Sequence, residues 1–141
     1  MTWESRFASL LRKIKKFTLN QSAPKSHQTM RPHKLQVAFL KQNGKIESNV
    51  FDLKTSKNAT NVEFLLGKKC PAAVIPNNED HTYALVAFDP KTQNYIENNL
   101  SKIRSSSLQT IIWNSLYYQV FHGKMAPTKY FDIIFSQNII E

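Results

Sequence analysis

The residue types that most often carry catalysis or bind metals are scattered along this chain. Its four histidines show no spacing typical of metal ligands, and no H-E-x-x-H motif occurs; they are His27, His33, His81 and His122. The single cysteine, Cys70, excludes an internal disulfide and a multi-cysteine zinc site. We therefore expect this chain to contribute no catalytic residue, no cofactor-binding residue and no metal ligand.

Two smaller polar groups have structural explanations. Lys68 and Lys69 precede Cys70, a setting that can activate a thiol, but no histidine adjoins it, so we expect a structural cysteine. The acidic cluster Glu79-Asp80-His81 lacks a nucleophile and a metal partner, and a β-turn between Pro76 and Thr82 explains it.

The net charge of +9 is unevenly distributed. Residues 1–34 hold eight basic residues and one acid, 8 − 1 = +7, which leaves about +2 for residues 35–141.

With 141 residues, 41% of them hydrophobic, the chain suits one domain or two small packing units with a folded core. Its longest apolar runs are far too short for a transmembrane segment, and we expect none.

The N-terminal residues carry the spacing of one helix face, which predicts a basic amphipathic helical arm over 1–19. The apolar positions are Trp3, Phe7, Leu10, Leu11, Ile14 and Phe17. Three roles are open for such an arm. It packs its apolar face on the rest of the chain, it directs import into mitochondria, or it contacts an anionic membrane or nucleic acid. Nucleic acid is not favoured, because no basic motif interleaved with aromatic residues follows.

Residues 20–33 are polar and interrupted by Pro24 and Pro32, which predicts an extended connector. No apolar region of a secretory signal follows the basic stretch. We therefore expect an intracellular protein, cytoplasmic or mitochondrial, rather than a secreted one.

Residues 34–89 have the pattern of a small β-sandwich or antiparallel meander. Alternation from Lys34 to Leu40 predicts a half-buried strand, and Asn43-Gly44 predicts a hairpin to a partner strand over Ile46–Leu53. Further short strands are expected where apolar residues alternate or cluster, at Val62–Leu66, Ala72–Ile75 and Tyr83–Phe88.

Residues 90–141 are expected to form helices. Asp89-Pro90 predicts one helix start, the serines at 105–107 a second that runs to Gly123, and Pro127 a third. The fold class is therefore α+β, with strands first and helices after them. We expect the aromatic residues Trp113, Tyr117, Tyr118 and Phe121 to lie in the core.

The apolar faces at the two ends of the chain predict protein partners, bound through the N-terminal and the C-terminal helix. The candidate partner-binding residues are Trp3, Phe7, Leu10, Leu11, Ile14, Phe135, Ile139 and Ile140.

Several segments resemble one family. They are Gln21-Ser22-Ala23-Pro24, Arg31-Pro32-His33 with the strand to Leu40, Ile75 to Ala84, the helix containing Trp113, and Ala126-Pro127. In this order they are similar to the β-sandwich subdomain and first C-terminal helices of the aminopeptidase N-type zinc metallopeptidases, the gluzincin aminopeptidases. Asn78, Glu79 and His81 depart from the family's acidic loop at this position.

The resemblance implies a non-catalytic C-terminal part of such an enzyme. The family's zinc-binding H-E-x-x-H and its substrate-binding Gly-x-Met-Glu-Asn are absent from this chain. We expect a fragment or truncated paralogue that acts as a scaffold or interaction module. The alternative is a repurposed structural subunit of a larger assembly, with mitochondria as one location.

Overall fold

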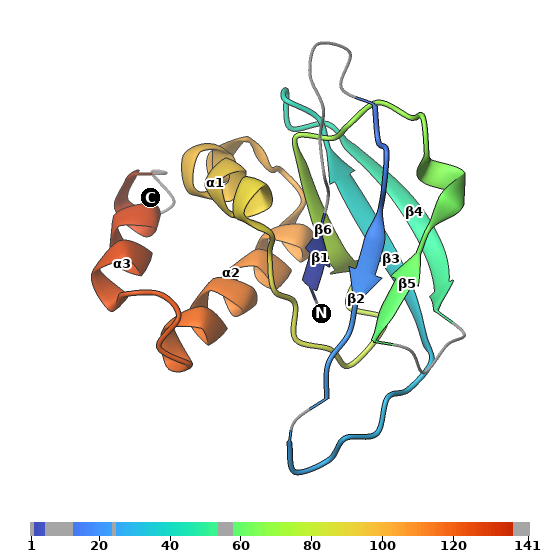
Figure 1. Cartoon of the computed structure of the whole chain (residues 1–141). Helices are drawn as coiled ribbons and strands as arrows, with labels where there is room; N and C mark the ends of the chain where they lie inside the picture. The colour runs from blue at the N-terminus through green and yellow to red at the C-terminus, as the bar shows by residue number, and fades with distance from the viewer. Residues whose placement is uncertain (1, 5–12, 24, 54–57, 137–141) are drawn as a thin grey trace.

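The computed structural model describes residues 2–4, 13–23, 25–53 and 58–136. Within them, two three-stranded antiparallel sheets precede three α-helices, which confirms the α+β class (Figure 1). The first sheet has the order β1-β2-β5, formed by Thr2–Glu4, Thr18–Asn20 and Ala59–Asn61. The second has the order β4-β3-β6, formed by Ile46–Leu53, His33–Leu40 and Ala73–Asn78.

The helices cover one side of the second sheet (Figure 1). They are α1 (Pro90–Asn99), α2 (Ser106–Phe121) and α3 (Pro127–Ser136), and a 3-10 turn, η2, follows α1 at Leu100–Lys102. A second 3-10 turn, η1, lies at Glu63–Leu65. No helix in the described part of the chain is long and apolar enough to cross a membrane.

Strand β3 separates two hydrophobic cores. Leu35, Val37 and Phe39 lie in the core between the two sheets, whereas Ala38 and Leu40 belong to the core under the helices. Successive side chains of a strand point to opposite faces, so one strand can serve both cores. The predicted half-buried strand is therefore buried on both faces from Val37 to Leu40, because the helices cover the second face.

The local signals for turns and caps are confirmed. Strands β3 and β4 pair antiparallel across the Asn43-Gly44 turn, where the Gly44 N–H donates to the Lys41 carbonyl at 2.9 Å. The Asp89 side chain accepts hydrogen bonds from N–H groups in the first turn of α1, and Ser105 caps α2 in the same way. The predicted turn over the acidic cluster is present at positions 79 and 80.

The predicted N-terminal helix lies mainly on residues 5–12, outside the described residues, and it is wrong at both described ends. Thr2–Glu4 form strand β1, which pairs with β2. Ile14 and Phe17 are buried between the sheets, and the Ile14 N–H donates to the Lys68 carbonyl at 2.8 Å. Pairing with a distant segment overrides the helical spacing, since propensity is a weak local preference.

Two other expected strands are replaced. Val62–Leu66 follows β5 directly and contains the turn η1 instead of a strand. Val62 and Leu65 are both buried, and their spacing of three residues suits a 3-10 turn. Tyr83–Phe88 has no regular structure. Directly before it, the Asn77 side chain bonds both backbone groups of Thr82, at 2.7 and 3.1 Å, and holds the chain in a turn at this point.

Candidate functional site

Large aromatic side chains are exposed on the α2–α3 hairpin, the part of the helical layer that includes the helix farthest from the sheets (Figure 1). Phe121 is 72% exposed and Phe135 is 66% exposed. We call the whole group the aromatic surface; its members are Tyr117, Tyr118, Phe121, Phe131 and Phe135. Tyr118 contacts Phe121 on α2, and Phe131 stacks on Phe135 on α3, so neighbouring aromatic rings are exposed on both helices. Groups of exposed apolar residues commonly mark a surface that binds another protein.

The buried face of α2 determines which side chains reach this surface. Leu108, Ile112 and Leu116 are fully buried under the helix at a spacing of four residues. Positions 117 and 121 are displaced from that stripe and point away from the core. The aromatic surface therefore follows from the orientation of α2 on the second sheet.

Helix α3 is held through one side and exposed on another. Ile133 is buried, and the Tyr130 ring packs edge-on against Trp113 of α2, with centroids 5.6 Å apart. Phe131 and Phe135, one turn apart, stack with centroids 6.4 Å apart and remain exposed. α3 thus presents an aromatic pair outward while its inner side anchors it.

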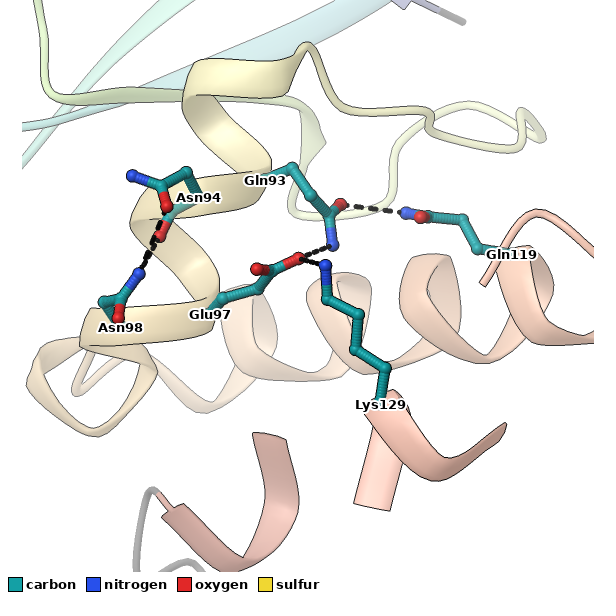
Figure 2. Close-up of polar contacts among 6 residues, drawn as sticks. All are labelled: Gln93, Asn94, Glu97, Asn98, Gln119 and Lys129. Atoms are coloured by element: carbon teal, nitrogen blue, oxygen red, sulfur yellow. Dashed lines mark hydrogen bonds and ion pairs between the residues drawn. The ribbon is translucent and has the colours of Figure 1, made fainter. Parts of the chain in front are cut away.

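Polar contacts connect the three helices (Figure 2). The Gln119 amide of α2 donates to the Gln93 Oε1 of α1 at 3.1 Å, and the Gln93 amide donates to Glu97 at 3.0 Å. Lys129 of α3 forms an ion pair with the same Glu97 oxygen at 2.8 Å. Glu97 of α1 thus contacts both Gln93 of its own helix and Lys129 of α3. The network holds the α2–α3 hairpin, which carries the aromatic surface, against α1.

Burial raises the pKa of the Tyr130 phenol, and the neighbouring Tyr117 raises it further. Both effects disfavour the phenolate: burial removes water, and a second phenolate nearby would repel it. Tyr130 therefore stays neutral over a wider pH range than an exposed tyrosine, as suits a residue packed between two helices.

The predicted partner-binding residues have different positions. The structure leaves Phe135 exposed, and its binding to a partner stays a prediction. Ile14 is a correction: it is 5% exposed, because it fills the space between the sheets, and it is not available to a partner. The side chains at positions 3, 7, 10, 11, 139 and 140 lie outside the described residues.

Most of the aromatic surface differs from the sequence-based prediction. Helical spacing predicts Tyr117, Tyr118 and Phe121 in the core, whereas these residues are exposed; Trp113, also predicted there, is half-buried. Phe131 is exposed too and is not among the predicted partner-binding residues. The available signal was the offset of positions 117 and 121 from the stripe of buried aliphatic residues, which a helical projection of α2 would have shown.

Histidine side chains in the described part of the chain contact polar and aromatic neighbours. His33 Nδ1 bonds the Thr82 hydroxyl at 2.8 Å, and the His122 ring packs on Tyr118, with centroids 4.2 Å apart. Within the described residues, no group of three or more His, Cys, Asp or Glu side chains could hold a metal ion. These residues therefore do not fit a zinc site, and we derive no hydrolytic step from them.

Comparison with known proteins gives a distant relation. No protein-family model matches the chain. Aminopeptidase N from Streptomyces lividans is 24% identical over 132 residues, an alignment that covers 87% of this chain and 15% of the relative. The chain thus spans about 15% of the length of that curated relative. It is similar to a part of an aminopeptidase, at a level that supports a remote, aminopeptidase-like relation.

Proposed function

We propose that this chain is a non-catalytic, aminopeptidase-like module that binds a protein partner through the aromatic surface of the α2–α3 hairpin. The observation that carries the proposal is the exposure of Phe131 and Phe135 on a helix that is anchored through its opposite side. In this proposal the sheets and the inner helices are a scaffold, and the aromatic surface is the part that contacts the partner.

Apolar burial supplies the driving force for such an interaction. Aromatic side chains bury about 150–250 Å² each, and they dominate the energetics of many interfaces. The polar network around Glu97 holds the two helices in place before binding, so that less ordering is required when a partner docks.

The first experiment compares the size of the endogenous chain on denaturing and native gels. We expect a native complex much larger than the calculated 16.3 kDa. A denaturing band several times larger than this mass would identify the partner surface as another part of the same polypeptide. A native species at the monomer mass would contradict the proposal.

Matched variants test the surface itself. Replacing both Phe131 and Phe135 by serine should release the chain from the complex, because it removes the stacked aromatic pair. Tyr83→Ser is the control, since Tyr83 is fully exposed on the loop between β6 and α1. Retention of the complex by the double variant, or its loss in the control, would rule out the aromatic surface.

Activity is tested separately. We expect the purified chain to hydrolyse no aminoacyl anilide and to retain no stoichiometric zinc after dialysis. Zinc-dependent hydrolysis by the purified chain would overturn the non-catalytic part of the proposal.

The alternative, a structural subunit imported into mitochondria, derives from the basic charge of the first 34 residues. Fusing residues 1–19 to a fluorescent protein tests it without disturbing the fold, to which Ile14 and Phe17 contribute. Cytosolic fluorescence would remove the support for this location.

A further inference from the structure

A hollow of about 580 Å³ lies where three distant segments meet: the β3–β4 turn, the loop before β6 and the first turn of α1. Apolar side chains form part of its lining, among them Phe39, Pro71 and Ala72. Its charged lining residues are Lys41, Lys68, Lys69, Lys91 and Glu47. The volume falls within the range of about 300–1,000 Å³ that is typical of ligand pockets.

The charge of the hollow is strongly positive. Four lysines and one glutamate among its lining residues give 4 − 1 = +3. The Lys41–Glu47 pair is separated by 3.7 Å and both side chains are more than half exposed, so this pair neutralises little of the local field. Like charges gathered at one site repel one another, and a bound anion would relieve that repulsion.

Local contacts hold two of these lysines at the hollow. Lys91 Nζ donates to the Pro71 carbonyl at 2.5 Å, which keeps the start of α1 against the loop before β6. Lys68 Nζ lies 5.3 Å from the centre of the Phe64 ring, in a cation–π contact. Their ordering costs are thus partly met before any ligand arrives.

We propose that this hollow binds a small amphipathic organic anion. Its carboxylate or phosphate head interacts with the lysines, and its apolar body lies against the Phe39 and Pro71 side of the lining. The combination of a cationic rim with an apolar lining selects this class over a free inorganic anion, which would leave the apolar lining uncovered, and over a neutral lipid, which would leave the charge unbalanced.

Cys70 provides the readout, since it lines the hollow and is the chain's only cysteine. The probes are dodecanoate and dodecyl phosphate, below their micelle concentrations, and the reaction is alkylation of Cys70 by the neutral reagent iodoacetamide. Both probes should slow alkylation several-fold and saturably, and calorimetry should give one site. Acetate, dodecanol and dodecyltrimethylammonium should give no protection at the same concentrations.

Charge variants locate the head group. Lys69→Gln combined with Lys91→Gln should raise the concentration needed for half protection roughly tenfold, through the loss of charge-assisted contacts. A second pair, Lys41→Gln with Lys68→Gln, should act in the same direction without disturbing the Lys91 bond to Pro71. The control is Lys45→Gln, an exposed lysine of the same hairpin that does not line the hollow and should leave protection unchanged.

Four results would overturn the proposal: absence of protection, equal protection by dodecanol, undiminished binding by both folded double variants, or protection by anionic phospholipid vesicles alone. The last would indicate a membrane surface instead of a small ligand. The proposal does not depend on the aromatic surface, so Phe131→Ser with Phe135→Ser should leave Cys70 protection intact.

Discussion

Replacing Gly44 by alanine tests how closely the β3–β4 hairpin approaches the helical layer. Gly44 has φ = +78°, and a Cβ atom built on it would lie 2.7 Å from the Lys102 carbonyl oxygen at the end of η2. That separation is shorter than real Cβ contacts, and the obstacle is backbone rather than a flexible side chain. The hairpin or η2 must therefore move to accommodate alanine.

A matched control separates this contact from backbone strain. Gly67 has nearly the same angle, φ = +80°, with nothing within 4 Å of its built Cβ. Alanine in this conformation costs about 1–2 kcal/mol, and loss of chain entropy in the unfolded state returns about 0.4–1 kcal/mol. We expect Gly67→Ala to lower the free energy of unfolding by a net ~1 kcal/mol from these two terms.

Gly44→Ala carries the same strain plus the steric term, which overpacking data put at about 1–3 kcal/mol. The difference between the two variants should thus be ~2 kcal/mol, or about 1 M in the urea midpoint at a slope of ~2 kcal/mol/M. The assay is urea unfolding followed by tryptophan fluorescence, with the slope compared between variants. Midpoints that agree within about 0.2 M would refute the close approach of Gly44 to Lys102.

Three further perturbations test the elements that position the site. Asp89→Ala removes the cap of α1 and should cost about 1 kcal/mol in urea unfolding, whereas Asp89→Asn, which keeps an acceptor, should cost much less; equal losses would contradict a capping role. Leu116→Ala should lower the free energy of unfolding by about 2–5 kcal/mol, because the side chain is fully buried. Phe121→Ala at the exposed surface should lower it by less than about 0.5 kcal/mol, and similar values for the two variants would disprove the orientation of α2. The raised pKa of Tyr130 means that the folded state keeps this proton when the unfolded chain releases it near pH 10.0, so stability is present below that pH and falls as the pH rises through the folded value. Tyr130→Phe should flatten the fall in urea midpoint above pH 10.0, and an unchanged slope would argue against the packed phenol.

The features that were predictable from the sequence depend on short-range chemistry. Asp89-Pro90, Ser105 and Asn43-Gly44 each act on backbone groups within about four residues, so their outcome barely depends on the rest of the fold. The resemblance to aminopeptidases likewise agrees with the later comparison at the level of a distant, partial similarity.

Other features depend on partners far along the chain. Ile14 and Phe17 have helical spacing, yet backbone pairing of Ile14 with Lys68 and of Phe17 with Val62 holds them between the sheets. Tyr83–Phe88 alternates like a strand, yet this segment belongs to neither of the two sheets. Local periodicity cannot reveal such competition, because the competing partner lies elsewhere in the sequence.

The α+β class, the starts of α1, α2 and α3 and the main hairpin can be predicted from the sequence, because caps and turns are local properties of the chain. The exposure of Phe131 and Phe135 on α3, and the gathering of Lys41, Lys69 and Lys91 around one hollow, depend on the tertiary structure. The physical reason is that exposure and charge clustering depend on how the elements pack. Residues fifty positions apart become neighbours only when the two cores on either side of β3 have formed.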